Sequence, residues 1–194
     1  MHLKTLVVAI YPAIAAAQYS ISYFNALANG GEGDCSPDAN YAACGDVAEN
    51  VCCLASFTNS PVSVQGSNLD TTGVPDIITA YLGPSFNTAG CSVSCNSGGG
   101  DNTECVGCAD EDGNQDDIGG AIISVFGSKR AVSGDQQSVH ADRVGVYDTD
   151  IKAHRLFNIK SGVPAHVYNE LISAFHNGTK VSDLSDAVMA YELK

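Results

Sequence analysis

Eight cysteines carry the clearest chemistry of the sequence. An even number of thiols in an exported chain predicts disulfides. Cys52 and Cys53 are adjacent, so their side chains point apart and we expect them to pair with different partners. Closing a long loop constrains the unfolded chain most, so at least one disulfide is expected to join the two groups of cysteines. These groups are Cys35, Cys44, Cys52 and Cys53 before residue 54 and Cys91, Cys95, Cys105 and Cys108 after residue 90.

Two other uses of the cysteines are alternatives to structural disulfides. Cys91 and Cys95 together with Cys105 and Cys108 have a spacing that a zinc ion tolerates, although exported thiols oxidise. Cys105-Val-Gly-Cys108 has the spacing of a redox motif, but its surroundings do not resemble a thioredoxin-like strand followed by a helix.

The acidic run at residues 110–117 is the candidate metal site. No cofactor is expected, and calcium bound at this run is the alternative. Calcium takes several oxygen ligands, and the run offers them at alternate positions. An EF-hand loop also needs a glycine and a bidentate glutamate, where this chain has Gln115 and Ala121. A solvated acidic loop is therefore the alternative. The four candidate ligands are Asp110, Asp112, Asn114 and Asp116.

No catalytic residues are assigned, and we expect the protein not to be an enzyme. His166 and His176 do not have the i, i+4 spacing of a helical zinc site. The pattern His140-x-Asp142 has no partner serine, because no Gly-x-Ser-x-Gly motif occurs. A hydrolase with paired carboxylates stays an alternative, since 22 acidic residues make many pairs possible and none distinctive.

Charge is distributed unevenly along the chain, whose formal net charge is −13. Residues 18–128 contain no lysine or arginine, whereas residues 131–194 contain both charges and no cysteine. A strongly acidic chain repels nucleic-acid phosphates and anionic lipids, so neither is expected as a partner. An unidentified extracellular protein or cell-surface component, preferably cationic, is expected instead.

Lys129-Arg130 is the only dibasic pair, and it lies at this border in composition. In a secreted eukaryotic protein, Lys-Arg followed by a small residue resembles a site for a kexin-like protease. A solvated charge pair on a loop is the alternative. The expected organisation is a signal peptide over 1–17, an acidic cysteine-rich domain over 18–130 and a cysteine-free region over 131–194.

The first 17 residues have the three parts of a secretory signal peptide: a short basic start, an apolar centre and Ala15-x-Ala17 at the end. We therefore expect a secreted, extracellular protein that begins at Gln18. No later apolar run is long enough for a membrane span, for which about 18 residues are needed. Asn177-Gly178-Thr179 is the only N-glycosylation sequon.

The apolar patterns predict strands first and helices near the C-terminus. Strands are expected within 61–65, 74–83, 119–127 and 143–147, a loop over 96–102, and either a strand or a helix over 151–159. A helix is expected over 163–178, with Val167, Leu171, Ala174 and Phe175 as its apolar stripe. A second helix capped by Ser182 is expected to turn Leu184, Val188 and Tyr191 to the core. The fold class is thus α+β, with a disulfide-stapled β-rich N-terminal part and a small α/β or helical C-terminal part without cysteine.

The signal peptide, the Cys52-Cys53 pair, the Ser63-Val64 strand and the glycine-rich cysteine loops resemble the small cysteine-rich secreted proteins of filamentous fungi. This resemblance covers the cysteine-rich part of the chain. It implies an effector-like virulence role that acts by binding a host or cell-surface component. The alternatives are a kexin-processed two-chain killer-type toxin and a small extracellular carboxylate-dependent hydrolase.

Overall fold

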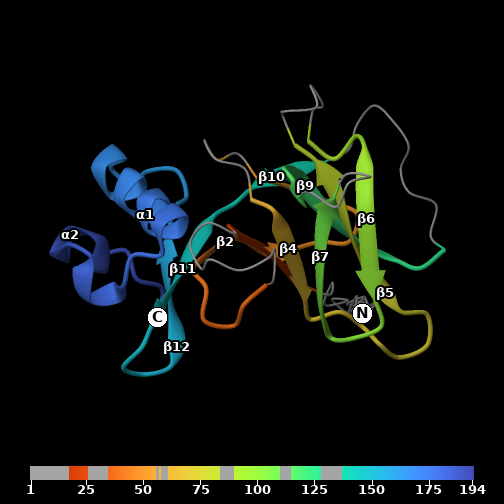
Figure 1. Ribbon diagram of the computed structural model, residues 1–194, viewed down its shortest axis with the longest axis horizontal. Helices are drawn as coiled ribbons and strands as arrows, with labels where there is room; N and C mark the ends of the chain where they lie inside the picture. Colours follow the sequence, from red (N-terminus) through yellow and green to blue (C-terminus); the bar gives the residue numbers. More distant parts are fainter. Residues whose placement is uncertain are drawn as a thin grey trace, which may run out of the picture.

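The computed structural model describes residues 18–25, 35–55, 57, 61–83, 90–109, 115–127 and 137–194. These residues form two facing β-sheets, with the helices gathered at one end (Figure 1). The first sheet has the order β12-β11-β2-β1-β4-β7-β8. The second has the order β10-β3-β9-β5-β6, in which only β10 and β3 are parallel.

The strands of the first sheet are β1 (Tyr19–Phe24), β2 (Tyr41–Val47), β4 (Ser63–Ser67), β7 (Thr103–Ala109), β8 (Gln115–Asp116), β11 (Arg143–Asp148) and β12 (Ala153–Asn158). Those of the second are β3 (Cys52–Leu54), β5 (Asp76–Leu82), β6 (Ser94–Gly99), β9 (Ile118–Val125) and β10 (Ser138–His140). Both sheets therefore contain strands from the cysteine-rich and from the cysteine-free part of the chain.

One apolar core fills the space between the two sheets. Ile21, Tyr23 and Val64 of the first sheet meet Ile78 and Ile123 of the second, and all five side chains are fully buried. Burying a side chain of this size contributes about 1.5–3 kcal/mol, so this core is a main source of stability.

Three predicted strands of the cysteine-rich part are confirmed as β4, β5 and β9. Strand β9 lies between β3 and β5, and seven of its eight residues are buried. A central strand covered on both faces needs an uninterrupted apolar run, which is why its pattern is not alternating. Gly119 allows close approach here, because a Cβ would lie 2.8 Å from the Gly83 Cα.

The loop expected over 96–102 is wrong for its first part. Ser94–Gly99 forms β6, an antiparallel neighbour of β5. The hydrogen bonds of a ladder come from the backbone, so a polar, glycine-rich segment forms a strand when its neighbour is present. A Cβ at Gly99 would lie 2.6 Å from the carbonyl oxygen of Asp76, so glycine permits this pairing.

In the C-terminal part, the predicted strand at 143–147 is confirmed as β11. Residues 153–158, left open between strand and helix, form the edge strand β12. The helix α1 (Ala165–Asn177) is also confirmed, with its four predicted stripe residues buried against β11 and β12. It ends at Gly178, whose φ of 64° is the left-handed conformation that glycine favours.

The second helix does not start at Ser182, so that prediction is wrong. Residues Val181–Asp183 form the 3-10 helix η3, and α2 (Asp186–Met189) follows Ser185. The Ser185 backbone N–H and hydroxyl both donate to the Glu170 carboxylate, at 2.7 and 2.8 Å, which ties this start to α1. Val188 is buried in the apolar cluster between α1 and the first sheet, and Leu184 and Tyr191 pack against that cluster, as expected.

The fold is α+β, with four disulfides in the β-rich part and a C-terminal helical part without cysteine. Among the described residues, no helix is long and apolar enough to cross a membrane.

Candidate functional site

Four disulfides use all eight cysteines, so structural disulfides are confirmed over zinc or redox sites. The pairs are Cys35–Cys105, Cys44–Cys53, Cys52–Cys91 and Cys95–Cys108. Cys52 and Cys53 have different partners, and two bridges join the early and late groups, both as expected. The two thiols of Cys105-x₂-Cys108 also bind different partners, which excludes a dithiol pair between them.

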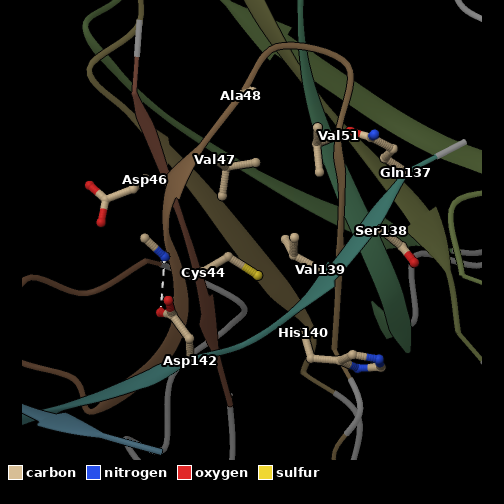
Figure 2. Close-up of a pocket in the computed structure, with 11 residues that line it drawn as sticks. Cys44, Asp46, Val47, Ala48, Val51, Gln137, Ser138, Val139, His140 and Asp142 are labelled. Atoms are coloured by element: carbon tan, nitrogen blue, oxygen red, sulfur yellow. Dashed lines mark hydrogen bonds between the residues drawn. The ribbon is translucent and has the colours of Figure 1, made fainter. Parts of the chain in front are cut away.

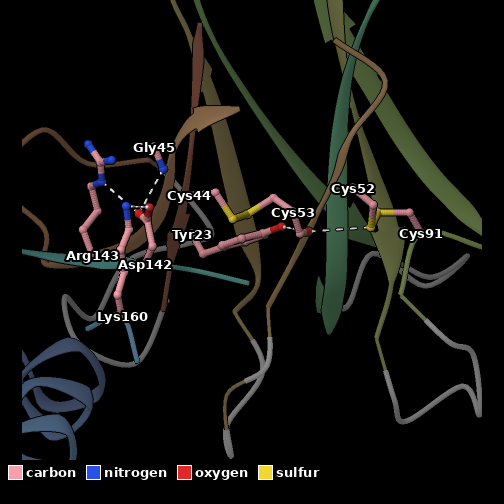
Figure 3. Close-up of a disulfide and its surroundings, with 9 residues drawn as sticks. All are labelled: Tyr23, Cys44, Gly45, Cys52, Cys53, Cys91, Asp142, Arg143 and Lys160. Carbon is pink, nitrogen blue, oxygen red and sulfur yellow. Dashed lines mark hydrogen bonds and ion pairs between the residues drawn. A yellow bond between two sulfur atoms is a disulfide. The ribbon is translucent and has the colours of Figure 1, made fainter. Parts of the chain in front are cut away.

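The Cys44–Cys53 bridge connects the two sheets, because it joins β2 to β3. The Tyr23 ring lies beside it, and its hydroxyl donates a 2.6 Å hydrogen bond to the carbonyl oxygen of Cys53 (Figure 3). Burial raises the pKa of this phenol, so the hydroxyl stays protonated. The bridge and this hydrogen bond connect β2 and β1 of the first sheet to β3 of the second, and Cys44 also lines the space described next.

Beside the Cys44–Cys53 bridge lies a groove of about 620 Å³, which we call the seam groove. It opens where the chain passes from β10 in the second sheet to β11 in the first. Val47, Val51 and Val139 point into the same space above the Cys44 sulfur (Figure 2). The full lining is Cys44, Gly45, Asp46, Val47, Ala48, Val51, Gln137, Ser138, Val139, His140 and Asp142.

Asp142 holds one end of the seam groove together. Its Oδ1 accepts hydrogen bonds from the Gly45 amide at 3.1 Å and the Arg143 Nε at 2.9 Å. Its Oδ2 lies 3.1 Å from the Lys160 Nζ (Figure 3). Burial opposes the charge, but these contacts outweigh burial and hold the pKa of Asp142 below its ordinary value of 3.8. The carboxylate is thus a structural anion rather than a proton donor.

Arg143 also reaches Asp46, whose carboxylate lies 3.1 Å from Nη2 and is 63% exposed. Gly45 makes room for this side chain, because a Cβ at position 45 would overlap the guanidinium. The groove end is therefore built from a glycine, two aspartates and an arginine, with each position constrained by the others.

His140, His154 and His176 have separate surroundings. His140 lines the seam groove, whereas the His154 Nε2 lies 2.8 Å from the carbonyl oxygen of Ala39. His176 packs between Phe57 and Phe175, and burial lowers its pKa. In the described part of the chain, no three metal-ligating side chains form a cluster.

Several sequence-predicted site residues lie outside the described residues. They are the signal peptide 1–17, Lys129, Arg130, Asp110, Asp112 and Asn114. Asp116, the last candidate calcium ligand, lies in β8 opposite Cys108. Asn177 of the sequon is exposed at the end of α1, where its Nδ2 donates to the Ser173 hydroxyl at 2.9 Å.

Sequence reasoning did not identify the seam groove. The pattern His140-x-Asp142 was noted only as an incomplete catalytic pair, and both residues prove to line the groove. The other signal was Gly45-Asp46 directly after Cys44, but nothing in one sequence places this part of β2 beside residue 139.

The chain matches no protein-family model, no curated protein and no solved structure.

Proposed function

We propose that this protein is secreted and acts without catalysis, by binding a host or cell-surface component. The observation that carries the proposal is the seam groove. Its walls are mostly apolar, polar side chains line its ends, and its base includes the disulfide-bonded Cys44. Binding sites of proteins have this character: mostly apolar walls, a few placed polar groups and a preformed shape. Its volume also lies in the usual range for such sites, about 300–1,000 Å³.

The polar groups at the groove serve binding better than catalysis. Asp142 is engaged by three donors, and Asp46 is paired with Arg143. A general base would need a free carboxylate with a pKa near the working pH, whereas the pKa of Asp142 is lowered. Fixed charges instead orient a bound partner.

Four disulfides support a place outside the cell, where oxidising conditions maintain them. An effector-like role follows from the resemblance to small secreted fungal proteins. A rigid, cross-linked protein pays little ordering entropy on binding, which favours recognition of a surface.

The test is saturation binding to intact cells. The disulfide-intact protein, labelled metabolically with a radioactive amino acid, is titrated onto panels of plant, animal and fungal cells. Metabolic labelling leaves every side chain chemically unchanged, including Lys160, whose Nζ pairs with Asp142 at the groove. We expect saturable binding to at least one cell type, competed by unlabelled protein and lost after reduction and alkylation. Binding that rises linearly on every cell type, or is equal for the reduced protein, would contradict the proposal.

A further inference from the structure

The sequon Asn177-Gly178-Thr179 lies where α1 ends and the chain turns back to the first sheet. Gly178 has a φ of 64°, and the Thr179 backbone N–H donates to the carbonyl oxygen of Ala174 at 3.2 Å. The Asn40 side chain donates to the carbonyl oxygen of Thr179. Main-chain groups therefore fix the backbone of the sequon, and this turn does not depend on the Asn177 side chain.

The side-chain amide of Asn177 is accessible for modification. Asn177 is exposed, and its Nδ2 donates at 2.9 Å to the hydroxyl of Ser173, which is exposed one turn earlier. A side-chain amide has two N–H donors, so Nδ2 can carry a sugar and still donate to Ser173. Side chains of a helix tilt toward its N-terminus. A sugar on Nδ2 therefore begins above the preceding turn of α1.

The outer face of α1 carries no charge, although the chain contains 22 acidic residues. The solvent-facing side of a surface helix usually holds charged as well as polar residues. Here no exposed position of the helix holds an aspartate, glutamate, lysine or arginine. An oligosaccharide is uncharged and hydrated, and the mostly small side chains of this face leave room for it. The exposed positions are Ala165, His166, Asn169, Ser173 and Asn177.

A glycan on this face leaves the seam groove open. The inner face of α1 packs against β11 and β12, so the outer face points away from the first sheet. No residue of α1 lines the groove. The helices lie at one end of the molecule, whereas β10 lies near its middle (Figure 1).

We propose that Asn177 carries an N-linked glycan that extends over the outer face of α1. In the transfer, Nδ2 forms a bond to the anomeric carbon of a lipid-pyrophosphate-linked oligosaccharide. The bond from that carbon to the pyrophosphate oxygen breaks, the lipid pyrophosphate leaves, and Nδ2 loses one proton. The inference rests on the secretion that the proposed function includes, and it adds a modification that binding does not require.

The first experiment measures the intact mass of the full chain, expressed with its first 17 residues and secreted by cultured insect cells. Peptide N-glycosidase should remove the mass of one oligosaccharide from wild type. Asn177→Gln and Thr179→Ala should each be secreted without that mass, because each removes a residue that the sequon requires. Asn169→Gln replaces an exposed asparagine of the same helix outside any sequon, and should keep the glycan.

Modification of histidines by diethyl pyrocarbonate tests where the glycan lies. His166 precedes Asn177 by about three helical turns, so both side chains lie on one face of α1. Because the glycan shares this face, His166 should react about threefold more slowly in glycosylated wild type than in Asn177→Gln. His140, which is exposed and lines the seam groove, is the internal control and should react equally in both proteins.

Secreted wild type at the mass of the bare polypeptide overturns the proposal, and so does a glycan that Asn177→Gln retains. Equal reaction of His166 in the two proteins overturns the placement over α1. Retention inside the cells without a glycan refutes this inference and secretion together. An unglycosylated secreted protein with saturable cell binding refutes this inference alone, whereas a glycosylated protein without saturable binding refutes only the proposed function.

Discussion

At the scale of single residues, the contacts of Asp142 matter most for the stability of the seam groove. It connects the start of β11 to the edge of β2 through Gly45 and to Lys160 beyond β12. Hydrogen bonds to a charged group contribute about 1.5–3 kcal/mol, more than neutral ones, so this carboxylate stabilises the seam as well as shaping it.

The lowered pKa of Asp142 has a definite consequence for stability. Above pH 3.8, the ordinary value for an aspartate, the carboxylate is ionised in the folded and the unfolded chain, and its contacts stabilise the fold. As the pH falls below that value, the unfolded chain binds the proton first. The stabilisation is lost by the pH at which the folded carboxyl is protonated as well.

We therefore expect Asp142→Asn to be less stable than wild type at neutral pH by about 1–3 kcal/mol. The difference should shrink as the pH is lowered from about 5 to about 2. Chemical unfolding at a series of pH values measures both effects. Asp150→Asn, in the exposed β11–β12 turn, is the control and should follow wild type. A constant deficit at every pH would refute the electrostatic role.

At the scale of elements, α1 is attached to the first sheet by more than its apolar stripe. Asn40, which is 5% exposed, precedes β2. Its Nδ2 donates to the carbonyl oxygens of Ala174 and Thr179, both at 2.9 Å, and its Oδ1 accepts from the Tyr147 amide. One side chain thus satisfies backbone groups of the helix end and of β11.

Asn40→Ala should destabilise the protein by about 3 kcal/mol, because the Tyr147 amide and the Thr179 carbonyl, both partly buried, lose this hydrogen-bond partner. Equilibrium denaturation in guanidinium measures this loss. Asn96→Ala provides a matched control, since both hydrogen bonds of the Asn96 side chain, to the Gly107 carbonyl and from the Ser97 amide, are exposed. It should cost less than about 1 kcal/mol. Equal effects of the two substitutions would mean that the hydrogen bonds of Asn40 do not hold α1 against the first sheet.

At the scale of the whole molecule, the Cys35–Cys105 bridge closes the longest loop, 70 residues, among the four disulfides. It attaches the segment before β2 to β7 in the first sheet. Loop-closure entropy predicts that the constraint on the unfolded chain grows with this length.

Replacing Cys35 and Cys105 together with alanine should lower the free energy of unfolding by about 4 kcal/mol. Denaturant unfolding without reductant is the measurement. The control replaces small polar residues within two positions of each cysteine, Ser36→Ala with Thr103→Ala, and keeps the bridge. A loss below about 1 kcal/mol in the cysteine variant would show that this bridge does not stabilise the fold by restricting the unfolded chain.

Local sequence patterns were sufficient to predict much of this fold. The apolar run of β9, the stripe of α1 and its Gly178 end are visible in the sequence, because burial and backbone conformation constrain those residue types directly. Adjacent Cys52 and Cys53 likewise required different partners, because their side chains leave the strand on opposite faces.

Long-range pairing determined the rest. Strand β6 has no apolar signal, and it forms because β5 offers a backbone partner. The pairing of the eight thiols depends on which strands stack, and the seam groove depends on β11 leaving β2 after Ala43. Residues 44–51 and 137–142 are about 90 positions apart in the chain. Their side chains meet only because the chain passes from the first sheet to the second between β2 and β3, and back between β10 and β11. No local propensity encodes such a meeting.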